Sequence, residues 1–266
     1  MSAYRQAARR ARILPPPSAA WAWFFDLDGT LIEIADVPSG VQVDEELRAL
    51  LESLAQASSG ALAVITGRPI ADIDRLFPDL RLPVAGQHGV ERRDRDGLVT
   101  HHTFPVAALD VARRRLSSLV ARHPALLLED KGLSLALHYR QAPSLAGYAH
   151  RVVRAAQQRV GAAFCVQRGK RVVELKPCGR DKGDAIAAFM EEPPFHGRVP
   201  VFVGDDSTDE LGFDVVNRMG GISVKVGGGR TSAAWKLGDV TAVRRWLGSD
   251  DAARRVARVT AVAGGA

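Results

Sequence analysis

Three apolar runs in this chain stop abruptly at polar residues, and this feature limits the possible folds more than any other. The runs are Trp21–Phe25 before Asp26, Ala61–Ile65 before Thr66, and Val199–Val203 before Gly204 and Asp205. Their length suits buried strands, and residues 44–58 and 69–77 between the runs have the spacing of helices. A strand–helix–strand–helix order predicts a parallel sheet, whose carboxyl-terminal edge is where ligands bind.

The middle of the chain breaks this order. Residues 105–122 and 143–159 read as helices, and each is followed by two short strands. Helix–hairpin–helix–hairpin predicts an antiparallel sheet of four strands covered on one face by two helices. We therefore predict an α/β protein with a Rossmann-like parallel-sheet core and an inserted α/β cap domain that acts as a lid. The predicted boundaries are a basic tail at 1–18, the core at 19–101 and 174–248, the cap at 102–173, and a C-terminal tail at 249–266.

Bulk composition excludes several classes of protein. The formal charge is +6, but no basic stripe alternates with aromatic residues, so we expect no nucleic-acid partner. No apolar stretch approaches the roughly 18–20 residues of a membrane-spanning helix. The two cysteines, Cys165 and Cys178, form no C-x-x-C pair, and such a composition favours a reducing cytosol. We expect a cytoplasmic protein, with a monomer as the default state.

The segment Asp26–Thr30 (D-L-D-G-T) places two carboxylates two residues apart at the end of a strand. In extended backbone both side chains point the same way. One carboxylate can then attack phosphorus while its neighbour transfers protons. The alternative interpretation is a turn rich in aspartate after a buried strand.

Two further strand ends and one lysine supply the partners that such chemistry needs. Thr66–Arg68 (T-G-R) offers a hydroxyl and N–H groups to phosphate oxygens, although an ordinary cap before a helix looks the same. Gly204–Glu210 has four acids in six residues, which suits Mg²⁺, although the helix dipole also favours acids there. Lys182 begins a predicted helix, where a cation is disfavoured unless it faces an anion, and the alternative is a solvated surface lysine.

In their order, these four segments resemble the four motifs of the haloacid dehalogenase superfamily. The resemblance covers about residues 21–247, and the second aspartate, Asp28, points to the phosphatase branch. It implies a Mg²⁺-dependent phosphatase whose cap is inserted between the second and third motifs. The implied catalytic residues are Asp26, Asp28, Thr66 and Lys182, and the implied metal ligands are Asp26, Asp28, Asp205 and Asp209.

Four segments narrow the resemblance to the trehalose-6-phosphate phosphatase family. They are Gly86–Glu91, Glu129–Gly132, His138–Arg140 and Glu174–Pro177. The family implies that Glu129, Lys131 and Glu174 bind sugar hydroxyls from the cap. The complete set of implied substrate-binding residues is Gly67, Arg68, His88, Gly89, Glu129, Lys131, Arg140 and Glu174. Alternatively, Glu129 and Lys131 only flank a hairpin turn, and Arg140 is an ordinary charge at a strand end.

The expected reaction is hydrolysis of trehalose 6-phosphate to trehalose and inorganic phosphate through an aspartyl-phosphate on Asp26. The nearest alternative is another sugar phosphatase of the same fold, acting on sucrose 6-phosphate or mannosyl-3-phosphoglycerate. A third is a catalytically silent domain that binds phosphosugars, which the presence of Asp26, Asp28 and Lys182 disfavours.

Overall fold

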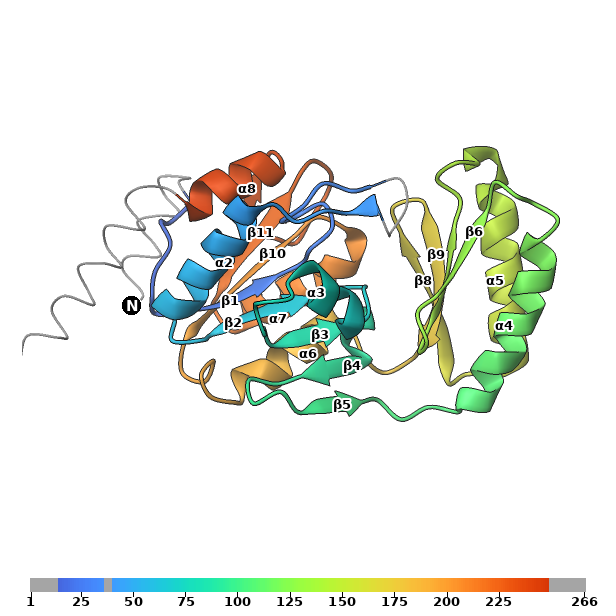
Figure 1. Cartoon of the computed structure of the whole chain (residues 1–266), viewed down its shortest axis with the longest axis horizontal. Coiled ribbons are helices and arrows are strands. Elements are labelled where there is room, and N and C mark those ends of the chain that lie inside the picture. The colour runs from blue at the N-terminus through green and yellow to red at the C-terminus, as the bar shows by residue number, and fades with distance from the viewer. Residues whose placement is uncertain (1–13, 36–39, 249–266) are drawn as a thin grey trace, which may run out of the picture.

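The computed structural model describes residues 14–35 and 40–248, and the first predicted strand lies at the centre of its larger sheet (Figure 1). This strand, β1 (Trp21–Phe25), pairs in parallel with β2 (Leu62–Ile65) on one side and β10 (Val199–Gly204) on the other. The helices predicted after β1 and β2 are α2 (Glu45–Ala57) and α3 (Ile70–Leu76). The parallel core predicted from the apolar runs is therefore present.

Eight strands form this sheet, in the order β12–β11–β10–β1–β2–β3–β4–β5. The strands not yet described are β3 (Val84–Gly86), β4 (Glu91–Arg93), β5 (Val99–His101), β11 (Ile222–Val226) and β12 (Trp235–Leu237). The strand β12 and the helix α8 (Val240–Leu247) follow β11. Strands β3 to β5 were not predicted, since each has only three residues; β4 and β5 form an antiparallel edge.

Helices cover both faces of the larger sheet, which explains why β1 is apolar throughout. Trp23 and Phe25 pack with α2, α3 and α8 on one face. Phe24 packs on the other face with α6 (Lys182–Met190) and α7 (Glu210–Arg218). Full burial of one such side chain stabilises the fold by about 1.5–3 kcal/mol, so the sheet is a rigid base for the residues at its edge.

A second domain carries the predicted antiparallel sheet, with strand order β6–β7–β9–β8. Its elements are α4 (Val106–Val120), β6 (Leu127–Asp130), β7 (Leu135–His138), α5 (Ala146–Val160), β8 (Phe164–Gly169) and β9 (Val172–Pro177). Figure 1 shows both helices on the outer face of this sheet, while the other face turns toward the larger domain. Glu129 and Glu174 both pair with Ala136, on neighbouring strands, so the two carboxylates share the inner face.

Two of the predicted boundaries need correction. Strand β9 pairs with β8 as far as Pro177, so the chain leaves the second domain after Pro177 rather than at residue 173. The predicted tail at 1–18 is too long, because Leu14 packs on the core and the Pro15 carbonyl accepts a hydrogen bond of 2.9 Å from Trp246. The rest of that tail, 1–13, and the predicted tail at 249–266 lie outside the described residues.

Cys165 and Cys178 form a disulfide, with their Cα atoms 5.2 Å apart. The cysteine pattern, which lacks a C-x-x-C pair, did not indicate this disulfide. Cys165 lies opposite Lys176 in the β8–β9 ladder, which brings it close to residue 178. Pairing register was not part of the sequence prediction. Among the described residues, each helix is too short or too polar to cross a membrane.

Candidate active site

Three carboxylates meet at the carboxyl-terminal edge of the larger sheet. Asp26 follows β1 and Asp205 follows β10. Asp209 lies four residues after Asp205, at the end of the 3₁₀ turn Ser207–Asp209. All three are buried, and each offers an oxygen within 4.8 Å of the oxygens of the other two. Gly29 makes this approach possible: its φ is +82°, and a Cβ there would collide with the Asp205 carboxylate.

Lys182 neutralises part of this cluster. Its Nζ lies 2.7 Å from Asp26 Oδ1 and 2.6 Å from Asp209 Oδ1, and its side chain is 2% exposed. Burial acts to lower the pKa of Lys182, but the carboxylates of Asp209 and Asp26 outweigh it and raise the pKa above its usual value. Lys182 is therefore a permanent ammonium beside Asp26. Lys176, a second buried lysine, donates to the Arg180 carbonyl at 2.6 Å.

The pKa of Asp26 is raised well above its usual value by burial and by the neighbouring carboxylates. Burial is the largest cause; Lys182 opposes it, and the charges of Asp209 and Asp205 add to it. Lys225 contacts the backbone carbonyl of Asp205. A buried group of oxygen ligands with surplus negative charge is what a hard divalent cation requires. The residues present therefore fit the predicted metal site.

Asp28 and Arg68 form a bidentate ion pair at the opening of the site. Arg68 donates from Nε to Asp28 Oδ2 at 2.7 Å and from Nη2 to Asp28 Oδ1 at 2.6 Å. This fork geometry fixes the orientation of the carboxylate. Thr66 is buried, and its hydroxyl accepts the backbone N–H of Arg68 at 3.1 Å. Thr66 thus shapes the turn that presents Arg68, as in the capping interpretation.

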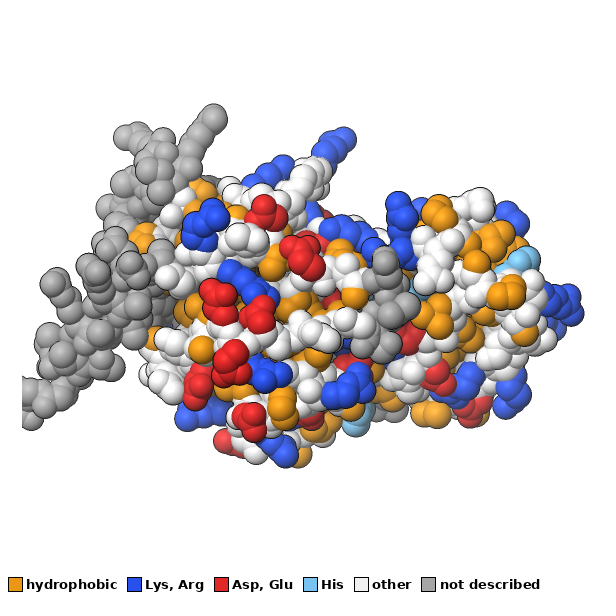
Figure 2. Space-filling view, turned by 45° about the horizontal axis from the view of Figure 1, so that its top comes forward, with side chains coloured by type: hydrophobic (Ala, Val, Ile, Leu, Met, Phe, Trp, Pro, Cys, Tyr) orange, Lys and Arg blue, Asp and Glu red, His pale blue; other side chains and the backbone are white. Residues whose placement is uncertain are grey.

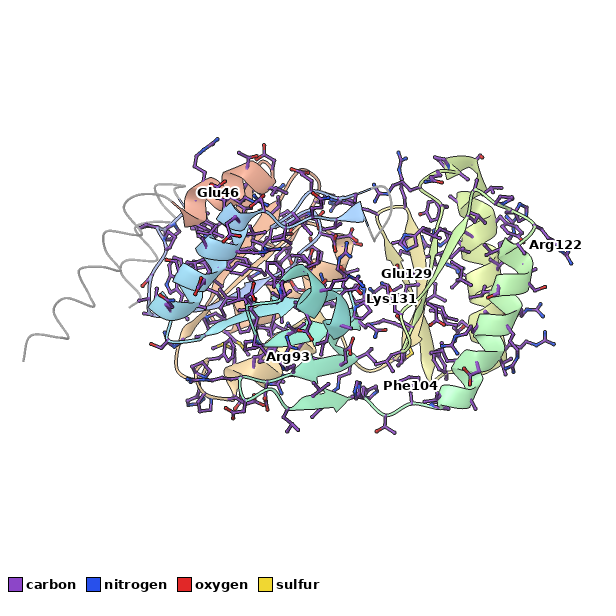
Figure 3. All side chains as sticks on the ribbon, in the orientation of Figure 1. Glu46, Arg93, Phe104, Arg122, Glu129 and Lys131 are labelled. Carbon is purple, nitrogen blue, oxygen red and sulfur yellow. A yellow bond between two sulfur atoms is a disulfide. The ribbon has the colours of Figure 1, made fainter. Side chains whose placement is uncertain are left out.

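The cap completes the cavity from the opposite side. Lys131 Nζ donates to the Gly67 carbonyl at 2.9 Å and lies 3.2 Å from a Glu174 oxygen, which links the two domains. Glu129 Oε2 lies 2.7 Å from His138 Nε2. Figure 3 shows Glu129 and Lys131 at the boundary between the domains. Glu129 and Lys131 do flank a hairpin turn, but that interpretation does not explain the contacts of their side chains.

Glu174 and His88 face each other across the same boundary, with His88 Nε2 3.4 Å from Glu174 Oε2. Burial acts to raise the pKa of Glu174, but Lys131, His88 and Ser134 outweigh it and hold the pKa well below its usual value. Burial lowers the pKa of His88 to about 4, although the Glu174 carboxylate opposes that shift. The pair is therefore a carboxylate beside a neutral imidazole near pH 7.

Most of the predicted residues line one cavity between the domains. These are Asp26, Asp28, Gly67, Arg68, His88, Glu129, Lys131, Arg140, Glu174, Lys182 and Asp205. Thr66, Gly89 and Asp209 lie behind the cavity wall instead. Gly89 has a φ of +92°, and a Cβ there would come 2.8 Å from the Asp181 carbonyl. Asp209 holds its own segment, because it accepts the N–H groups of Asp205 and Asp206, each at 2.8 Å.

Lys170 is a cavity residue that the sequence interpretation did not assign. It lies in the turn between β8 and β9, and its ammonium contacts the Asp205 carboxylate across the domain boundary. We predict two short strands after residues 143–159 from the sequence but assign no role to the turn that connects them. The signal available in the sequence was a pair of cations, Arg168 and Lys170, at the tip of a cap hairpin on the side of the predicted phosphate site.

Known proteins resemble this chain over most of its length. The model of the trehalose-phosphatase family matches residues 24–239. Trehalose-6-phosphate phosphatase of Escherichia coli K12 is 50% identical over 239 residues, which are 88% of this chain and 87% of that protein. A probable trehalose-phosphate phosphatase of Sinorhizobium fredii is 43% identical over 207 residues, or 78% of each protein.

Solved structures agree on the fold. The C-terminal domain of trehalose-6-phosphate phosphatase from C. albicans superposes with a TM-score of 0.78 at 22% identity, over 87% of this chain and 91% of that one. A haloacid dehalogenase-like hydrolase from B. subtilis superposes with a TM-score of 0.57 at 16% identity, over 86% and 99%. The predicted core with an inserted cap is thus confirmed as a fold of the haloacid dehalogenase type. On the family match and the identity to curated relatives, the chain belongs to the trehalose-phosphatase family.

Proposed function

We propose that the protein hydrolyses trehalose 6-phosphate to trehalose and inorganic phosphate. The observation that carries this proposal is the position of Asp26, beside the permanent ammonium of Lys182 and beneath a cap whose acidic and basic groups face the cavity. Such a site combines a phosphoryl-transfer centre with groups that bind sugar hydroxyls. The named function of the E. coli relative supports the same substrate.

We propose that Mg²⁺ is the cofactor of this reaction. Asp26, Asp205 and the backbone carbonyl of Asp28 would hold it, with Asp209 orienting the segment from behind. When bound, the cation neutralises charge on the phosphate oxygens and on the buried carboxylates. Only oxygen ligands meet at this point of the described structure, which is the preference of Mg²⁺.

Asp26 then attacks phosphorus and forms an aspartyl-phosphate while the sugar oxygen leaves. Asp28 protonates that oxygen, and afterwards takes a proton from the water that hydrolyses the intermediate. Arg68 holds the Asp28 carboxylate at the opening of the site, so the group that transfers protons is oriented before substrate arrives and takes up its proton when this ion pair opens. Lys182 stabilises charge on the phosphate oxygens, which is the main contribution that a protein makes to phosphoryl transfer.

The cap selects the group that leaves. Glu129, Lys131 and Glu174 face the cavity from β6, the β6–β7 turn and β9, and can bind hydroxyls of the sugar. Docking of the cap excludes water from Asp26, which favours transfer to the aspartate. Arg140 lies at the rim, 3.4 Å from the Lys170 carbonyl, and is placed to meet an anionic substrate on entry.

The expected partner is the phosphosugar alone. On the face shown in Figure 2, acidic and basic side chains are interspersed over the larger domain, as expected for a solvated surface. The absence of a nucleic-acid partner, the monomeric state and the cytoplasmic location remain predictions from the sequence.

A panel of phosphosugars tests the proposed function. Phosphate release with Mg²⁺ is measured for trehalose 6-phosphate, sucrose 6-phosphate and mannosyl-3-phosphoglycerate, and kcat/KM is compared. The expected result is the highest value for trehalose 6-phosphate, and a preference for either of the others would overturn the proposal. Binding of these sugars without release would instead support a silent phosphosugar-binding domain.

A further inference from the structure

A chain of buried polar contacts runs from the cap into the core behind the cavity wall. Ser134, just before β7, has its Oγ 2.6 Å from Glu174 Oε1 and 2.9 Å from Gln87 Oε1. Ser134 belongs to the cap and Gln87 to the core. Their relative exposures are 0% and 1%, and neither lines the cavity. The contact is therefore a dry polar junction between two domains.

The chain continues inside the core. Gln87 Nε2 donates to Glu91 Oε1 at 3.0 Å, and the same oxygen accepts the backbone N–H of Ile70 at 3.0 Å. Ile70 begins α3, two residues after Arg68. Close polar contacts thus connect the cap carboxylate Glu174 with the turn that carries Arg68, and the single hydrogen of the Ser134 hydroxyl goes either to Glu174 or to Gln87.

The backbone at this junction takes an unfavourable conformation. Gln87 and His88 have φ values of +47° and +60°, in the left-handed region that side chains other than glycine rarely adopt. A residue in this conformation persists only where its surroundings hold it. Here the conformation directs the Gln87 amide to Ser134 and the His88 ring to Glu174. Both contacts cross the domain boundary.

The hydroxyl of Ser134 has one hydrogen and two acceptors. Its distance of 2.6 Å to Glu174 is that of an O–H···O⁻ bond, so the hydrogen lies on the Glu174 side. When a sugar hydroxyl donates to Glu174, the hydrogen can turn to the Gln87 carbonyl without leaving an unpaired buried group. Ser134 therefore has a partner with and without substrate, and such pairing avoids the cost of an unsatisfied buried donor.

We propose that Ser134 and Gln87 are positioning residues for substrate selectivity. They fix Glu174 relative to Arg68 and Asp26 when the cap is docked, so that the sugar and the phosphate of one molecule are bound together. This inference rests on the proposed function. It predicts a loss that is larger for a phosphosugar, which uses Glu174, than for p-nitrophenyl phosphate, which has no sugar hydroxyls.

The experiment compares Ser134→Ala and Gln87→Met with the matched control Ser58→Ala. Ser58 is equally buried, and its hydroxyl donates to the Leu54 carbonyl at 2.7 Å in α2, away from the cap. For each protein, kcat/KM is measured with the phosphosugar that the wild type prefers and with p-nitrophenyl phosphate. Loss of a hydrogen bond to a charged group lowers the ratio of the two values by about tenfold, and Ser58→Ala leaves that ratio unchanged.

Two further measurements keep the test decisive. In Ser134→Ala, the backbone amides of residues 66–68 and 70 are expected to exchange hydrogen faster than in Ser58→Ala, because one of the links between this segment and the cap is gone. The double variant of Ser134 and Gln87 is expected to lose little more than either single variant, since both break one chain. Equal losses on the two substrates, or additive losses in the double variant, would overturn the inference. The wild-type panel alone decides the proposed function, so the two failures are distinguishable.

Discussion

Lys182 provides the sharpest test of the site, because its removal leaves two buried carboxylates without their shared cation. In Lys182→Met, Asp26 and Asp209 both lose an ammonium at 2.6–2.7 Å. Breaking a buried ion pair by removing one partner costs about 3–5 kcal/mol. Asp209 keeps two backbone N–H donors, so the lower end of that range is expected. A loss of about 3 kcal/mol lowers Tm by about 6–12 °C in a domain of this size.

The assay is thermal unfolding of the variant in EDTA and in Mg²⁺, together with phosphate release. We expect Mg²⁺ to restore much of the lost Tm, because the cation replaces the missing positive charge. Turnover should stay at least about a hundredfold below wild type, since an oriented charge at the phosphate is worth about 10²–10³ in kcat. The difference in the free energy of unfolding between the two proteins should also narrow as the pH falls. Lys182 opposes the raised pKa of Asp26, so its removal lets the folded variant take up that proton at higher pH than wild type.

Lys176→Met is the matched control for this experiment. Lys176 is similarly buried, but its Nζ donates to a backbone carbonyl and lies outside the carboxylate cluster. Lys176→Met should lower Tm less than Lys182→Met does. Mg²⁺ should raise the Tm of Lys176→Met no more than it raises that of wild type. A Lys182→Met protein that unfolds within about 2 °C of wild type in EDTA would refute the reasoning. Equal stabilisation of both variants by Mg²⁺ would refute it as well.

Three more predictions follow from the geometry of the site. Asp26→Asn should abolish phosphate release while the protein stays folded, as measured by circular dichroism; appreciable turnover would exclude Asp26 as nucleophile. Gly29→Ala should lower Mg²⁺ affinity and turnover together, because its Cβ collides with Asp205; unchanged Mg²⁺ titrations would contradict this. Wild type should lose stability as the pH falls from about 6.5 to about 4, because His88 is neutral when folded and takes up a proton when unfolded. His88→Asn should lack that loss of about 3 kcal/mol, and identical pH profiles in urea unfolding would count against it.

The strand-end motifs were readable from the sequence because each depends on local signals. An apolar run that stops at Asp26 or Thr66 fixes both the strand and the residue at its end, and the structure has β1 and β2 at those places. The short strands β3 to β5 gave no comparable signal, since three residues are too few for a periodic pattern. The second domain was predictable in its elements, whereas its exit at Pro177 depended on the pairing of β8 with β9.

The contacts between domains were beyond sequence reasoning for a different reason. Ser134 and Gln87 are 47 residues apart, and neither is unusual in its own segment. The contact of the Thr66 hydroxyl with the backbone N–H of Arg68 was not predicted, and the role of Thr66 at the phosphate stays a prediction. Such partners follow from the register of the small sheet and from the way the cap docks, which no local pattern encodes.

The charges of the cavity suggest how substrate enters. Arg68 is paired with Asp28, Lys131 with Glu174, and Lys170 with Asp205. Lys131 also donates to the Gly67 carbonyl of the core, and Lys170 of the cap pairs with Asp205 of the core. Both lysines therefore hold the cap on the core while they balance charge. We therefore expect a phosphate dianion to enter by exchange with these ion pairs rather than by filling a site of unpaired cations. Release of the cap would separate Lys170 from Asp205 and leave that carboxylate without its cation, which costs several kcal/mol unless Mg²⁺ takes the place of the ammonium.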